Sequence, residues 1–268
     1  QSAREFTELA QWVNYDGHRS LFESRSKNRM GLLMWMSHPC WPSMVWQTYD
    51  YYLEPTAAYF AIKKASEPLH IQWNPATDEV EVVNYSAGTH SHLTARVQIL
   101  NMDASVAWEK ETTVDSREDT TEKCIKLEFP ETLSEVYFIK LWLLEDGKIL
   151  SDNFYHASRK GINYQALKQL PEVTLDCQAK MAQDKEGNWT ATVTLTNPTS
   201  TPALMTRINV VGDKDGDQFL PILYEDNYFA LLPGEQKEVS VRWKDVDTRG
   251  NSPVIRITGY NVKELSRQ

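Results

Sequence analysis

The sequence has little of what several protein classes require. Its three cysteines, Cys40, Cys124 and Cys177, are odd in number and far apart, so they give neither a disulfide framework nor zinc-ligand spacing. No apolar run approaches the roughly 18 residues that cross a membrane. The chain has 28 Lys and Arg against 37 Asp and Glu, which gives a formal net charge of −9. The phosphates of a nucleic acid would repel such a surface. We therefore expect no nucleic-acid or membrane partner, no metal and no cofactor. Each cysteine is expected to be a small buried residue, and for Cys40 a contact with substrate stays open as an alternative.

Aromatic residues, in contrast, are concentrated in one irregular stretch, residues 35–59. Flat ring faces stack on the C–H faces of a pyranose, and indole N–H and phenol O–H groups reach its hydroxyls. The stretch therefore predicts a sugar-binding surface, and on composition alone a cap of core aromatics at one end of a domain stays open as an alternative. Its rings are Trp35, Trp41, Trp46, Tyr49, Tyr51, Tyr52 and Tyr59.

Residues 1–66 have the pattern of a helix, a strand and a second helix. Apolar residues recur at helical spacing from Phe6 to Phe22, with a loosening expected at Asp16 and Gly17. The pattern breaks at residues 28–31, and the unbroken apolar run 32–36 then predicts a strand buried on both faces. A helix is expected at 57–65, with two lysines near its C-terminal end.

A strand buried on both faces needs parallel neighbours, and no other predicted strand of the chain is an unbroken apolar run of this kind. Residues 1–66 are therefore expected to be a remnant of a larger α/β domain. The aromatic stretch follows the C-terminal end of the predicted strand, where (β/α)8 barrels place their binding groups. The first residue is Gln1 rather than Met, which favours truncation, although a cleaved signal peptide would also remove the Met.

From Leu69 onward, short and mostly alternating segments are separated by turn residues, which is typical of antiparallel sandwiches. Residues 67–156 and 172–268 each have about the length of one immunoglobulin-like domain, and the polar segment 157–171 is expected to link them, with a helical turn at 164–170. Val80, Val82, Leu93, Ala95, Val97 and Ile99 are predicted to face inward. Strands are expected at 70–73, 79–84, 93–100, 107–113, 123–129, 137–145, 148–155, 173–181, 189–197, 203–211, 236–243 and 253–261.

Two runs resemble glycoside hydrolase family 2, and within it the exo-β-glucosaminidase and β-mannosidase-like branch. The first covers 31–72 and carries Trp35, Trp41-Pro42, Trp46 and Asp50-Tyr51 before a lysine-containing helix. The second, 220–235, is similar to a stretch of the last β-sandwich in that branch. The resemblance implies a mainly β fold, in which two immunoglobulin-like β-sandwich domains follow the helix-strand-helix remnant of a (β/α)8 barrel.

The resemblance also implies an activity, the retaining hydrolysis of a β-glycosidic bond by two glutamates. In the family both lie on earlier barrel strands, so no residue of this chain is expected to be catalytic and the chain alone should be inactive. Trp35, His38, Trp41 and Trp46 align with positions that line the subsite for the non-reducing sugar. The β-mannosidase pattern has Asn-Asp where this chain has Ser37-His38, which leaves the sugar open. Asp50 is expected to be a structural acceptor that holds the loop.

Other interpretations stay open. The chain could instead be a non-catalytic carbohydrate-binding or scaffolding module, with Tyr224, Tyr228 and Phe229 as a glycan surface or, alternatively, as sandwich packing. Asp213, Asp215 and Asp217 have a partial likeness to a calcium loop, but the glycine is misplaced, so a solvated turn is expected. The resemblance implies a periplasmic or extracellular location, and a cytoplasmic one is also compatible with the composition.

Overall fold

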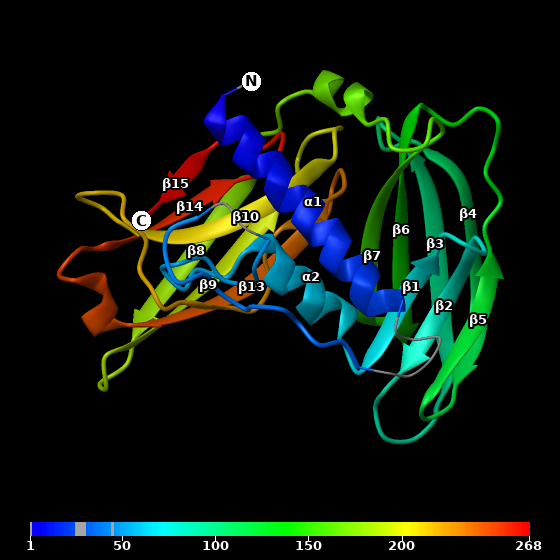
Figure 1. Ribbon diagram of the computed structural model, residues 1–268, viewed down its shortest axis with the longest axis horizontal. Helices are drawn as coiled ribbons and strands as arrows, with labels where there is room; N and C mark the ends of the chain where they lie inside the picture. The colour runs from blue at the N-terminus through cyan, green and yellow to red at the C-terminus, as the bar shows by residue number, and fades with distance from the viewer. Residues whose placement is uncertain (1, 25–30, 44–45) are drawn as a thin grey trace. The chain divides into compact units, whose positions relative to one another are not determined.

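The computed structural model describes residues 2–24, 31–43 and 46–268 (Figure 1). Residues 28–30 of the predicted break and residues 44–45 of the aromatic stretch lie outside them. The chain forms two compact units, which we describe separately. Unit 1 contains Gln1–Asp16, Met34–Phe60 and Pro171–Gln268, and unit 2 contains Gly17–Leu33 and Ala61–Leu170. Within the described residues, no helix is long and apolar enough to cross a membrane.

The two helices are α1, Ala3–Ser24, and α2, Ala57–Ala65. Helix α1 begins with a capping box, because the Glu5 N–H donates to Ser2 Oγ at 3.2 Å and the Ser2 N–H donates to Glu5 Oε2 at 2.8 Å. It continues through Asp16 and Gly17, where we expected a loosening. Helix α2 has the predicted bounds.

The predicted strand at 32–36 is wrong. These residues are neither helix nor strand, and Leu33 is 103% and Trp35 75% exposed. A strand needs a neighbour to accept and donate its backbone hydrogen bonds, and no described segment pairs with this run. The apolar side chains that predicted burial on two faces therefore contact solvent.

Unit 2 contains two antiparallel sheets, as the alternating pattern predicts. The first has the order β1-β2-β5 and the second β4-β3-β6-β7. All six side chains predicted to face inward are buried in the core of this unit. The strands are β1 Leu69–Asn74, β2 Glu79–Asn84, β3 His90–Asn101, β4 Val106–Ser116, β5 Thr120–Lys126, β6 Val136–Glu145 and β7 Lys148–Ser158, followed by a 3-10 turn at Gln165–Gln169.

Unit 1 contains the other two antiparallel sheets, ordered β12-β10-β14-β15 and β11-β13-β9-β8. The sequence did not predict β11, β12 and β15, which have only two or three residues each. Bounds are β8 Asp176–Gln183, β9 Asn188–Thr196, β10 Ala203–Gly212, β11 Leu223–Tyr224, β12 Phe229–Leu231, β13 Gln236–Lys244, β14 Pro253–Thr258 and β15 Leu265–Arg267, with a 3-10 turn at Asp245–Thr248.

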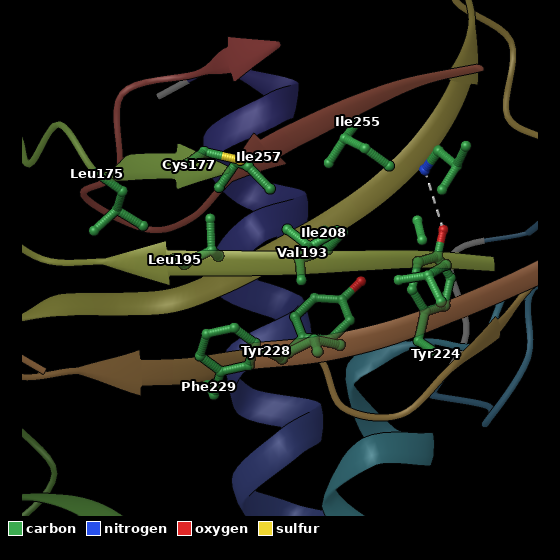
Figure 2. Packing of buried hydrophobic residues seen from close by; sticks show 14 of the residues in the cluster. Leu175, Cys177, Val193, Leu195, Ile208, Tyr224, Tyr228, Phe229, Ile255 and Ile257 are labelled. Atoms are coloured by element: carbon green, nitrogen blue, oxygen red, sulfur yellow. Dashed lines mark hydrogen bonds between the residues drawn. The ribbon is translucent and has the colours of Figure 1, made fainter. Parts of the chain in front are cut away.

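The core of unit 1 settles the role of three aromatic residues. Tyr224, Tyr228 and Phe229 are buried in it, so they pack the sandwich and do not form an exposed glycan surface. Figure 2 shows their rings with aliphatic side chains such as Val193 and Ile208. The Tyr224 hydroxyl accepts a hydrogen bond from the Val210 N–H at 3.2 Å. Burial raises the pKa of the Tyr224 and Tyr228 hydroxyls.

The cysteines differ in their surroundings. Cys177 is buried in the core of unit 1 and Cys124 is partly buried, but Cys40 is exposed, which corrects the expectation that all three would be buried. Burial raises the pKa of the Cys124 thiol to about 12. This thiol donates a hydrogen bond to the Val80 carbonyl at 3.3 Å.

Unit 2 buries an ionic network around His70. The Nδ1 atom of His70 lies 3.2 Å from Glu67 Oε2, and its Nε2 atom lies 3.2 Å from Glu23 Oε1. Glu23 Oε1 also accepts hydrogen bonds from the Tyr155 hydroxyl and from Asn153 Nδ2, each at 2.8 Å. A neutral imidazole carries one N–H, so only the imidazolium donates to both carboxylates. Burial lowers the pKa of His70, but the hydrogen bonds that it donates to Glu23 and Glu67, with their negative charges, raise it more.

Further charges complete this network. Lys64 lies 2.9 Å from Glu67 and 3.1 Å from Asp152, whose other oxygen contacts the buried Lys140 at 2.5 Å. The guanidinium of Arg19 lies 4.1 Å from the centre of the Tyr155 ring. Opposite charges alternate through the network, which is the condition for burying them at acceptable cost.

Candidate functional site

The aromatic loop is held by a tight turn around Asp50. Its Oδ1 atom accepts the N–H of Tyr52 at 2.8 Å and the N–H of Glu54 at 2.9 Å. Leu53 inside the turn adopts a φ of 67°, a left-handed conformation that these hydrogen bonds support. Burial raises the pKa of Asp50, although its backbone hydrogen bonds oppose the shift. The prediction that Asp50 is a structural acceptor is confirmed by this geometry.

Hydrogen bonds from two threonine side chains tie segments of the aromatic loop to one another. Thr48 Oγ1 donates to the Ser37 carbonyl at 2.8 Å, and the Tyr49 N–H donates to the same carbonyl at 3.0 Å. Thr56 Oγ1 donates to the Gln47 carbonyl at 2.7 Å, just before α2 begins. Ser37 and His38 are therefore presented from a fixed backbone, with Ser37 Oγ 3.2 Å from His38 Nδ1.

His38 lines a pocket of about 340 Å³ within unit 1. One wall comes from the aromatic loop, and the other is Pro221, Ile222, Leu223 and Tyr224 from the last sandwich. The two stretches that carry the family resemblance thus meet at one cavity. Tyr49 and Tyr59 also line it, with ring centres 5.3 Å apart, and burial followed by the contact with Tyr59 raises the pKa of Tyr49.

The three tryptophans of the predicted site are exposed and are not part of this pocket's lining. Trp35 is 75%, Trp41 69% and Trp46 45% exposed. Large exposed rings are informative because folding otherwise buries them. The structure therefore places His38 in a cavity and leaves the three indoles on the surface.

The sequence did not indicate the ion pair that fastens this loop to the last sandwich. Glu54 Oε1 contacts the guanidinium of Arg207 on β10 and accepts a hydrogen bond from Asn209 Nδ2 at 3.1 Å. Both acidic groups of the loop are thus engaged, Asp50 in its turn and Glu54 with Arg207. Nothing in the residues around Glu54 signals a partner about 150 positions away, so only the fold reveals it.

In the acidic loop 213–217, two of the three carboxylates accept backbone N–H groups. Asp215 Oδ1 accepts the Asp217 N–H at 2.9 Å, and Asp213 Oδ1 accepts the Ser252 N–H at 2.9 Å. Gly216 adopts a φ of 71°, as the predicted turn requires. Across the described residues, no group of three His, Cys, Asp or Glu side chains is arranged to hold a metal ion.

Comparison with known proteins identifies one part of the chain. Residues 153–262 match the exo-β-D-glucosaminidase Ig-fold domain. The chain carries the Ig-fold domain of exo-β-D-glucosaminidases. This Ig-fold domain contains most of the strands of unit 1, together with the segment 221–224 that walls the His38 pocket.

Whole-chain relatives agree with this assignment. The chain is 32% identical to an exo-β-D-glucosaminidase of Streptomyces avermitilis over 97% of its own length and 32% of the relative's. A relative of the same description from Amycolatopsis orientalis is 31% identical over 96% of this chain and 28% of that protein. The crystal structure of the Amycolatopsis orientalis exo-chitosanase CsxA superposes with a TM-score of 0.90 at 28% identity, over 98% of this chain and 34% of that one. The chain spans about a third of these glycoside hydrolases.

Proposed function

We propose that this chain is the C-terminal part of a retaining β-glycosidase of glycoside hydrolase family 2, acting on a terminal β-linked amino sugar. It would supply Trp35, His38, Trp41 and Trp46 to the pocket for the non-reducing sugar and add two supporting sandwiches. The observation that carries the proposal is that the aromatic loop, which exposes the three indoles, meets the Ig-fold domain of exo-β-D-glucosaminidases at the pocket of His38.

The chemistry divides between this chain and groups outside it. Retaining hydrolysis needs two carboxyl groups about 5 to 5.5 Å apart, one as acid and base and one as nucleophile. Asp50 and Glu54, the acidic groups of the aromatic loop, are engaged in structural contacts. The chain's contribution is therefore binding: indole faces for the sugar ring, and the imidazole of His38 for a hydroxyl or amine. Without the two carboxyl groups the isolated chain should not hydrolyse glycosides.

The proposal extends to the compartment in which the protein acts. A polymeric substrate of amino sugars does not enter a cell, which favours the periplasm or the outside over the cytoplasm.

The test is a chimera in which this chain replaces the matching third of the Streptomyces avermitilis relative. Hydrolysis of a chromogenic β-D-glucosaminide is expected to persist. Trp41→Ala and Trp46→Ala should each raise KM at least about tenfold, which corresponds to about 1.4 kcal/mol of lost binding. Val246→Ala, at an exposed apolar side chain on a 3-10 turn, is the control and should change nothing. Unchanged kinetics in both tryptophan variants would contradict the role of the loop.

A non-catalytic carbohydrate-binding module is the second candidate, favoured by the exposure of the three indoles. It predicts that the 268-residue chain binds β-linked oligosaccharides by calorimetry and that the chimera is inactive. An active chimera with normal KM would favour the enzyme.

A further inference from the structure

A second cavity, of about 400 Å³, lies within unit 1, and its lining shares no residue with the pocket at His38. Its floor is the outer face of two paired strands. Arg207 and Asn209 of β10 pair with Thr258 and Arg256 of β14, and side chains two apart on a strand share a face. The alternate residues Ile208, Val210, Ile255 and Ile257 point the other way, into the core. The sequence therefore alternates core-forming and cavity-forming side chains along both strands.

The wall opposite this floor comes from the first turns of α1. Thr7, Glu8 and Gln11 line the cavity, and residues three and four apart share one side of a helix. Gln11 Oε1 accepts the Ala57 N–H at 2.9 Å, which fixes the amide and leaves its NH2 end to donate. Tyr260 closes one side, held by an edge contact with Trp12 at 5.0 Å between ring centres.

Each of the two cationic groups of the cavity lies near a carboxylate. Arg207 is bound by Glu54, and its guanidinium lies 5.6 Å from the centre of the Tyr228 ring. Its Nε atom is buried and has no hydrogen-bond partner. Arg256 Nε lies 3.7 Å from Glu264 Oε1, a separation too long for a hydrogen bond.

The charges exclude a simple anion site. The lining carries two carboxylates, Glu8 and Glu264, beside its two guanidinium groups, and Arg207 is already paired with Glu54 from outside the lining, so an added negative charge is not favoured. The lining mixes fixed donors, acceptors and two tyrosine rings, which suits a ligand with several neighbouring hydroxyls and an apolar ring face. Carboxylates beside these groups suit an ammonium substituent.

We propose that this cavity binds one unit of an amino-sugar chain, as a binding site separate from the aromatic loop. Its volume is within the roughly 300 to 1,000 Å³ of small-ligand sites. Because the site is built from the sheet face and α1, it does not depend on whether the aromatic loop completes an active site. In an enzyme that acts on a polymer, such a site would keep the substrate close between turnovers.

The test is calorimetric titration of the 268-residue chain with a β-1,4-linked trimer of glucosamine. All proteins carry Trp41→Ala and Trp46→Ala, so that the aromatic loop does not contribute. We expect saturable binding, weakened at least about tenfold by Arg256→Gln and by Thr258→Phe, which fills the floor. Arg242→Gln, at an exposed arginine of β13 in the same unit, is the matched control and should bind normally.

Circular dichroism checks that each variant is folded. If Thr258→Phe does not fold, the binding measured for Arg256→Gln alone decides the test. The proposal is overturned if the background protein shows no saturable binding, or if both cavity variants bind as the control does. Neither result affects the chimera test of the aromatic loop, so failure of this site and failure of the proposed function are distinguishable.

Discussion

His70 is the residue whose protonation state the fold determines most strongly. Its two ring nitrogens face the carboxylates of Glu23 and Glu67, and hydrogen bonds to both raise its pKa against the effect of burial. Removing either carboxylate would leave a buried cation short of a partner, a change that typically costs about 3–5 kcal/mol. The network thus ties α1 and the segment after α2 to β1 and β7 inside unit 2.

We predict a stability that falls with rising pH because of this histidine. Because the pKa of His70 is higher in the folded than in the unfolded protein, its protonation stabilises the fold. This stabilisation is fully present below the unfolded pKa of about 6.5 and is lost as pH rises through the folded pKa. Each unit of difference contributes about 1.4 kcal/mol. In urea denaturation between pH 6 and pH 9, His70→Gln should therefore lose most stability relative to the parent at the lower pH.

The control is His92→Gln, at an exposed histidine, which should leave the pH profile of the parent intact. A His70→Gln deficit that is the same at both pH values would show that the ring serves only as packing.

At the scale of elements, α1 has an interior glycine that weakens it. Gly17 lies mid-helix, and a Cβ added there meets nothing within 4 Å. Gly17→Ala should raise the free energy of unfolding by about 0.5–1 kcal/mol, because alanine restricts the unfolded chain and favours the helix. Thermal and urea unfolding of the 268-residue chain, with and without the substitution, measure the change.

Gly88 is the matched comparison, since a Cβ there also meets nothing, but its φ is +83°. Gly88→Ala should destabilise by about 1 kcal/mol or more, because an L residue is strained in this conformation. Equal effects at the two glycines would contradict the argument from backbone conformation.

How much the sequence predicted depends on whether a segment's partners are local. Val80 and Val82, alternating within one strand, predicted their inward face correctly, and α2 was predicted with its true bounds. The run 32–36 is an unbroken apolar stretch without that alternation and has no described strand beside it, so its composition alone overpredicted a strand. The sequence indicated the aromatic loop but not its link through Glu54 to Arg207, because that contact joins segments that only the tertiary fold brings together.

For the whole molecule, the excess of acidic residues bears on the proposed substrate. A net charge of −9 gives the surface a negative potential, which attracts a protonated amino-sugar polymer before any specific contact forms. In the cavity between α1 and the β10–β14 face, the carboxylates of Glu8 and Glu264 lie beside two guanidinium groups, and one of these, that of Arg207, is already paired with Glu54. Long-range attraction and local recognition would thus favour the same class of ligand.

This attraction predicts a salt dependence that separates charge from shape. Between about 10 mM and 150 mM salt the Debye length shrinks from roughly 30 Å to 8 Å, so binding of a glucosamine oligomer to the full chain should weaken severalfold. The N-acetylated oligomer of the same length has the same ring faces and most of the same hydroxyls but no ammonium groups. Its affinity, measured by calorimetry in the same buffers, should change little. Equal salt slopes for the two oligomers would mean that the acidic surface plays no part, and recognition would then rest on ring stacking and hydrogen bonds alone.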